Sequence, residues 1–119
     1  MPGKSPTQRT LEWYKNQGYV CGKVELWIPG TKITRDLYGF ADLEVFGYGE
    51  VVLVQCTTWP NFSSRNKKIL ANENAKKWIM NNKTCSIHLV AWGKKKGSKK
   101  WEPKIKWYKA CEFDDKWYL

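Results

Sequence analysis

The sequence predicts an α/β fold, in which a central sheet of about five strands is flanked by helices and residues 1–119 form a single domain. Two observations predict it. Segments in which apolar and polar side chains alternate, as in strands, are interleaved with two segments in which apolar side chains recur at helical spacing. A length of 119 residues with 42% hydrophobic content is enough for one compact core and not for two.

The N-terminal segment predicts a helix over residues 5–17 and then a strand. Ser5 is a suitable N-cap, and Gln8 stands at the position where a capping-box side chain reaches back to the cap. The alternation that follows predicts a strand over 19–28. The segment 31–37 is then expected to be a loop that leads into the centre of the fold.

Two strands, 35–46 and 51–57, are predicted to form a hairpin around the turn 47–50, because its glycines can supply the positive φ of a tight reversal. If the register places Asp42 near Gln55, polar oxygens project together from the middle of a sheet. A carboxylate there costs several kcal/mol unless it is paired, hydrated or bound to metal. This pair is therefore the centre of the candidate site.

The C-terminal half is predicted to contain a second helix and two more strands. Trp59 and Phe62 are larger than a plain connector needs, so their loop is expected to be functional. Pro103 favours an edge position for the last strand. The predicted order is a loop over 58–64, a helix from Ser63 or Ser64 to about Met80, a strand over 84–92, a lysine-rich turn over 93–100 and a strand over 101–113.

The composition favours a nucleic-acid partner. The chain carries 21 basic and 11 acidic residues, a formal charge of +10, and eight tryptophans. A basic surface interleaved with aromatic rings suits nucleic acid better than a membrane, although an ordinary basic soluble domain is the alternative. Because no apolar run approaches about 20 residues and no signal peptide is evident, we expect a cytoplasmic protein without a membrane partner.

The candidate phosphate contacts lie on the second helix and in the lysine-rich turn. Such a turn is often only a solvated loop that deters aggregation, but together with the helix it becomes a candidate DNA-binding surface whose affinity depends on salt. Tryptophans near strands are ordinarily packing residues, although several could stack on bases. The candidate nucleic-acid-binding residues of this part are Trp59, Arg65, Lys68, Lys94, Lys95 and Lys96.

The four cysteines favour reduced thiols. Cys21, Cys56, Cys85 and Cys111 are widely spaced, and each falls in a predicted strand. A zinc site would need two of them to meet His88, and nothing in the spacing favours this. Buried thiols of a cytosolic protein are the better interpretation.

A helix that carries Glu12, a strand that carries Asp42, a strand that carries Gln55-Cys56-Thr57 and then a helix resemble the PD-(D/E)xK nuclease superfamily. The resemblance covers about residues 5–92 and is strongest, over 35–42 and 54–57, to small Holliday junction resolvases of phages and archaea. It implies a restriction-endonuclease-like α-β-β-β-α-β core with a mixed sheet.

The resemblance also implies roles for individual residues. Asp42 matches the aspartate that holds a divalent metal, and Glu12 matches a helix glutamate that completes the metal site. Gln55 stands where the family has glutamate, and Thr57 stands where it has lysine. The backbone carbonyl of Cys56 is a further implied ligand.

Residues around this motif extend the implied site. Asp36 is expected to bind metal or metal-bound water, and Arg35 to hold a phosphate. Because Thr57 cannot supply a cation, Lys67 or Lys68 is the candidate for a displaced catalytic lysine. The implied cofactor is Mg²⁺ or Mn²⁺, whose charge assists phosphodiester hydrolysis.

Three functions follow as hypotheses. The first is a metal-dependent endonuclease in DNA recombination that cuts branched DNA as a homodimer, since cutting two strands symmetrically calls for two related sites. Its activity is expected to be weak because Gln55 and Thr57 depart from the motif. The alternatives are a catalytically inactive nucleic-acid-binding module with the same fold and a structural protein whose basic face binds another protein.

Overall fold

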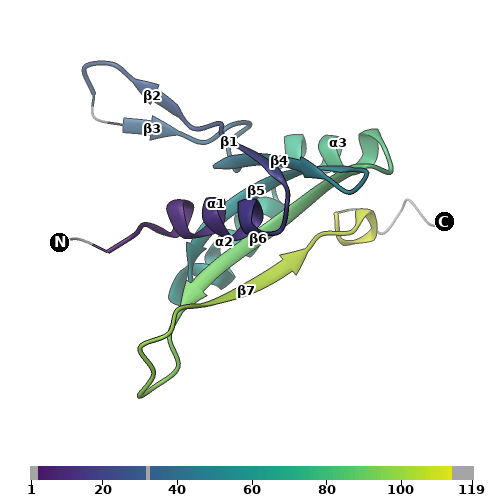
Figure 1. The fold of residues 1–119 in the computed structure, drawn as a ribbon. Helices are drawn as coiled ribbons and strands as arrows, with labels where there is room; N and C mark the ends of the chain where they lie inside the picture. The colour runs from purple at the N-terminus through teal and green to yellow at the C-terminus, as the bar shows by residue number, and fades with distance from the viewer. Residues whose placement is uncertain (1–2, 32, 114–119) are drawn as a thin grey trace.

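The computed structural model describes residues 3–31 and 33–113 and shows an α/β fold with a mixed five-stranded sheet (Figure 1). The strand order is β1-β4-β5-β6-β7, and β2 and β3 form a separate hairpin. The elements are α1 Pro6–Asn16, β1 Val20–Lys23, β2 Leu26–Ile28, β3 Ile33–Arg35, β4 Leu43–Gly47, β5 Glu50–Thr58, the short 3₁₀ helix η1 Trp59–Asn61, α2 Phe62–Leu70, α3 Glu73–Asn81, β6 Cys85–Gly93, β7 Glu102–Trp107 and the 3₁₀ helix η2 Ala110–Glu112.

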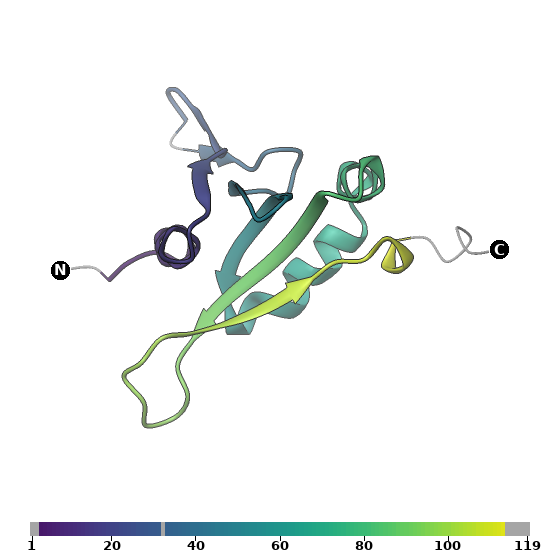
Figure 2. The same cartoon turned by 45° about the vertical axis from the view of Figure 1, so that its right-hand side comes forward.

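The helices cover both faces of the sheet. Figures 1 and 2 show α1 on one face and α2 and α3 on the other. The strands β5 and β6 pair in parallel, and all other neighbours pair antiparallel. A parallel pair needs a long crossover connection, and α2 and α3 provide it. The consequence is a central pair of strands that is buried on both sides.

The core has one layer on each face of the sheet. The layer beneath α1 is built on Val52, Val54 and Val90, with Tyr14 packed against them. The layer beneath α2 and α3 contains Leu53 and Leu89, together with Phe40, Ile69 and Ala75 from other elements. Burial on both faces explains why β5 reads as a nearly continuous aliphatic run.

The predicted first helix is confirmed, including its cap. The Ser5 hydroxyl accepts a hydrogen bond from the Gln8 backbone N–H at 3.1 Å. The central hairpin is also confirmed, because Gly47 pairs with Glu50 across a turn in which Tyr48 and Gly49 both have positive φ.

Two predicted strands are shorter in the structure. The segment 19–28 divides, since β1 pairs with β4 while β2 leaves the sheet and pairs with β3, so that a strand lies within the predicted loop 31–37. Of the predicted strand 35–46, only the part from Leu43 lies in the sheet. Before it the chain turns through Tyr38 and Gly39, whose φ values of 57° and 84° do not fit a strand.

The predicted second helix is two helices. Asn72 separates them, because its side-chain oxygen accepts from the Ala75 N–H at 2.9 Å and so caps α3. The last strand ends at Trp107 and is followed by η2, so Cys111 lies outside the sheet. Pro103 does lie in the edge strand β7, as predicted.

All four cysteines are free thiols. Within residues 3–31 and 33–113, none of the helices has the length and apolar character needed to cross a membrane.

Candidate metal and nucleic-acid site

Three carboxylates meet beside the central hairpin. Glu25, Asp36 and Asp42 each offer an oxygen, and these oxygens lie within 4.8 Å of one another. Glu25 follows β1, Asp36 follows β3, and Asp42 precedes β4. We call these three residues the acidic cluster.

The register of the hairpin positions Asp42. Leu43 pairs with Val54, and the Asp42 N–H donates to the Val54 carbonyl at 2.8 Å, which brings the Asp42 side chain to Gln55 as predicted. Its Oδ2 accepts from the Gln55 Nε2 and from the Cys56 backbone N–H, both at 2.8 Å. The Asp42 carboxylate is thus fixed at the free edge of β5, next to where β4 begins.

The surroundings of Asp42 disfavour its negative charge. Asp42 is only 6% exposed. Burial raises the pKa of the Asp42 carboxyl to about 7, the hydrogen bond from Cys56 opposes this rise, and the neighbouring Asp36 and Glu25 add to it. A cation among the three carboxylates would remove this repulsion.

The donor set suits a hard divalent cation. Oxygen ligands are the ones that Mg²⁺ and Mn²⁺ prefer. The Gln55 side chain, 2% exposed, has its Oε1 buried without a hydrogen-bond partner in the described part of the chain, although its Nε2 binds Asp42. A buried acceptor without a partner beside three carboxylates fits the residues of an oxygen-ligated metal site.

Lys68 reaches the acidic cluster. Its Nζ lies 3.2 Å from the Asp36 Oδ2. Lys67, the other candidate for the displaced lysine, is exposed on α2, and Arg65 is half-buried there. Thr57 is buried on the same strand face as Gln55 and brings no charge.

The structure does not bring Glu12 to Asp42. The Glu12 carboxylate lies 2.9 Å from the Lys4 Nζ, and the hydrogen bond from Lys4 lowers its pKa. Glu12 lines a hollow with Trp13 and Trp101 on the α1 side of the sheet. In the acidic cluster the third carboxylate is Glu25, a residue that the sequence predicts to lie within an uninterrupted strand over 19–28. Cys56 contacts Asp42 through its N–H; its carbonyl stays a predicted ligand.

The candidate phosphate-binding residues are dispersed. Arg35 is exposed and directly precedes Asp36. In the turn between β6 and β7, Lys94 lies over the Trp101 ring, Lys95 is 3.8 Å from Glu102, and Lys96 is exposed. Figure 1 shows this turn extending away from the sheet.

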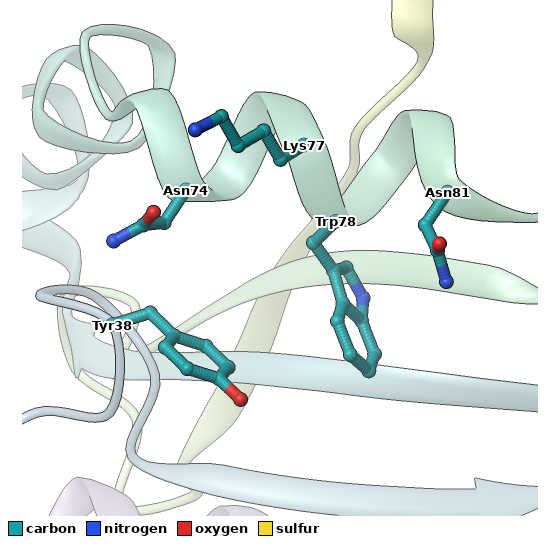
Figure 3. Close-up of a pocket in the computed structure, with 5 residues that line it drawn as sticks. All are labelled: Tyr38, Asn74, Lys77, Trp78 and Asn81. Atoms are coloured by element: carbon teal, nitrogen blue, oxygen red, sulfur yellow. The ribbon is translucent and has the colours of Figure 1, made fainter.

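A hollow of about 230 Å³ lies between α3 and the turn that follows Asp36. Figure 3 shows the Tyr38 ring facing Trp78 across it, with Asn74 and Asn81 toward its two ends. The Asn72 side chain holds this turn by donating to the Tyr38 carbonyl at 3.0 Å. Local sequence patterns carry no signal for this hollow, since Tyr38 lies 36 or more positions from the α3 residues that line it with Tyr38.

His88 is a core residue. Its Nδ1 lies 2.7 Å from the Tyr14 hydroxyl, and Trp107 stacks on the imidazole. Burial lowers the pKa of His88 to about 4, so the ring is neutral at pH 7.

Comparison of the chain with protein families, curated proteins and solved structures finds no match.

Proposed function

We propose that the protein is a Mg²⁺- or Mn²⁺-dependent nuclease that hydrolyses phosphodiester bonds in DNA. The observation that carries the proposal is the acidic cluster itself, in which Asp42 is buried against Gln55 on a chain of charge +10. A basic protein has ample cations for surface pairing, so three adjacent acids, one of them buried and two half-buried, point to a bound cation. The resemblance to resolvases favours branched DNA and a homodimer.

Each residue of the site has a distinct role in this proposal. Glu25, Asp36 and Asp42 would hold the metal ion, which when bound neutralises phosphate charge and activates water. Gln55 and the Cys56 N–H orient the Asp42 carboxylate through their hydrogen bonds.

Two basic side chains would bind the substrate. Lys68 already lies beside Asp36 and can turn to a phosphate oxygen, which would replace the cation that Thr57 lacks. Arg35, exposed at the end of β3, can hold a neighbouring phosphate. Substrate phosphates would therefore meet positive charge on either side of Asp36.

The decisive experiment compares the wild-type protein with Asp42→Asn. Both are incubated with four-way junction, flap, duplex and single-stranded DNA, with Mn²⁺ or with EDTA. We expect Mn²⁺-dependent cleavage that Asp42→Asn abolishes while DNA affinity in EDTA changes less than about twofold. Equal cleavage by both proteins would reject the acidic cluster as the catalytic site.

The second candidate is a catalytically inactive DNA-binding module. The specific observation in its favour is Thr57, which is buried where the nuclease motif has lysine. This module would bind DNA in a salt-dependent manner and show no cleavage with any of the four substrates in Mn²⁺.

A further inference from the structure

A second feature lies beyond the C-terminal ends of the parallel strands β5 and β6. It is a hollow of about 510 Å³ whose walls include Trp59, Trp92 and Trp101, with Pro60 beside them and Lys94 at its margin. We call it the tryptophan hollow. Ligands of α/β sheets commonly bind at the carboxyl ends of parallel strands, and this hollow opens there.

Trp59, which lines this hollow, carries a buried hydrogen-bond donor. Its ring packs against the Gly93 backbone so closely that a Cβ at position 93 would overlap it. Its indole Nε1–H is buried, and within the described part of the chain it meets no acceptor. A buried donor without a partner is destabilising, so an acceptor on a ligand that reaches it would be favoured.

Trp101 gives the hollow a positive margin. Trp101 is 37% exposed, and the Arg9 guanidinium lies 4.3 Å and the Lys94 ammonium 4.6 Å from the centroid of its ring. Lys96, in the same turn as Lys94, is also exposed. Indole walls with cations at the margin complement a ligand that has both a flat ring and a phosphate, as a nucleotide does.

The tryptophan hollow and the acidic cluster are connected through β5. Thr58, which lines the hollow, is two residues beyond Cys56, whose N–H holds Asp42. Two residues of a strand span about 7 Å. Trp92 packs in the layer beneath α1, whereas Gln55 shares the opposite strand face with Leu53, so a DNA strand that reaches both sites passes around the C-terminal end of β5.

We propose that the tryptophan hollow binds an unpaired base of the DNA strand whose backbone lies at the acidic cluster. The inference deepens the proposed nuclease function and rests on it for the position of that strand. The base stacks on the indoles, one of its carbonyl oxygens or ring nitrogens accepts from the Trp59 Nε1–H, and Lys94 and Arg9 contact the flanking phosphates. A base within a duplex cannot enter, because both its faces and its pairing edge are occupied.

The test measures binding in EDTA, where cleavage does not occur. Three labelled DNAs share one duplex and carry a blunt end, a three-nucleotide 3′ overhang, or an overhang of three abasic sites with the same phosphates. Stacking is worth about 1–3 kcal/mol per base, so the base-bearing overhang is expected to bind about 5- to 150-fold more tightly than the abasic one. Equal affinity for the two overhangs would overturn the proposal.

Variants then test whether the preference for base-bearing overhangs arises in the tryptophan hollow. Trp101→Ala and Trp59→Ala are expected to reduce the preference for bases to about twofold or less and to leave blunt-duplex affinity almost unchanged. Trp59→Phe keeps a ring against Gly93 and removes the Nε1–H donor, so it should fold normally and lose only part of the preference. The matched control is Trp107→Ala, which removes a 69% exposed tryptophan outside the hollow. A loss of preference in this control equal to that in Trp101→Ala would contradict the assignment.

The two proposals fail in different ways. A preference for bases in EDTA without cleavage in Mn²⁺ would reject the nuclease and keep the tryptophan hollow. Cleavage in Mn²⁺ without a preference for bases would keep the nuclease and reject the hollow. An RNA overhang on the same duplex, if it bound more tightly than the DNA overhang, would overturn the assignment to DNA.

Discussion

Asp42 combines burial, hydrogen bonding and neighbouring negative charge in one side chain. It is buried and accepts two hydrogen bonds at 2.8 Å, and one of its oxygens lies within 4.8 Å of oxygens of Glu25 and Asp36. The two hydrogen bonds favour the ionised form, whereas burial and the other carboxylates oppose it. Asp42 is therefore expected to exchange a proton for a metal ion near neutral pH, and two predictions follow from this.

The first prediction concerns how the free energy of unfolding of the metal-free protein, measured in EDTA, depends on pH. The folded protein retains the Asp42 proton up to about pH 7, whereas the unfolded chain releases it near 3.8. Unfolding therefore releases a proton between these values, and the free energy of unfolding falls as pH rises from about 4 to 7, by up to roughly 4 kcal/mol. Urea titrations of wild type and Asp42→Asn should show this contribution only in the wild type, with the variant the more stable at pH 8. An unchanged pH profile in the variant would contradict the assignment.

The second concerns metal binding without any substrate. A cation that binds only the folded state stabilises it by RT ln(1 + [L]/Kd), so the melting temperature rises with the logarithm of the cation concentration once this exceeds Kd. Addition of Mn²⁺ at pH 8 is expected to raise the melting temperature of the wild type by several degrees and to leave Asp42→Asn and Glu25→Gln unchanged. Glu12→Gln is the control, because the Glu12 carboxylate binds Lys4 and lies outside the acidic cluster. Loss of the shift in Glu12→Gln would show that this carboxylate is a ligand after all.

At the scale of elements, Asn72 links two parts of the fold. It caps α3 through its side-chain oxygen, and its side-chain nitrogen holds the Tyr38 carbonyl in the turn between Asp36 and Asp42. The backbone of this turn is already constrained by the positive φ of Tyr38. One side chain thus joins the α2–α3 break to the segment that carries two of the three acids.

Asn72→Ala should therefore affect both stability and metal binding. Loss of an N-cap costs about 1 kcal/mol, and loss of the contact with Tyr38 adds to it, so a decrease of about 1–2 kcal/mol in the free energy of unfolding is expected in urea. The Mn²⁺-induced rise in melting temperature should also become smaller, because Asp36 is held less firmly. Asn74→Ala, an exposed change in the first turn of α3, is the matched control. Equal effects of the two variants would contradict a linking role for Asn72.

At the scale of the whole molecule, the charge of +10 is spread over several surfaces. Lys68 and Arg35 lie by the acidic cluster, whereas Lys94, Lys95 and Lys96 lie in the turn beyond the tryptophan hollow. Contacts of lysine with phosphate release counterions and carry no base information. The turn is therefore expected to contribute affinity and not sequence preference.

Replacing Lys94, Lys95 and Lys96 by glutamine should weaken DNA binding for all sequences alike. Each lost phosphate contact lowers the slope of log affinity against log salt by about one, so a decrease of about two to three is expected. Fluorescence anisotropy between 50 and 200 mM salt measures it, with Lys15, Lys23 and Lys83 replaced by glutamine as a charge-matched control. A sequence-selective loss of affinity would contradict the assignment.

The pairing of Asp42 with Gln55 was predictable because a tight turn over 47–50 fixes the register of two short strands. Glu25 was not, because alternation continues through 19–28 and does not reveal that the chain leaves the sheet after Lys23. The predicted position of Glu12 beside Asp42 differs from the structure. Thr10 and Tyr14 face the core, and Glu12, two positions from each, points to the other side of the helix.

By itself, the sequence determined the α/β class, the first helix and its cap, the central hairpin and the position of Asp42 beside Gln55, because these depend on local periodicity and turn geometry. Only the tertiary structure decided that Glu25 and Asp36 join Asp42, that Lys68 reaches them, and that three tryptophans surround one hollow. These residues come from separate elements, and their proximity depends on how distant segments pack, which local patterns do not encode.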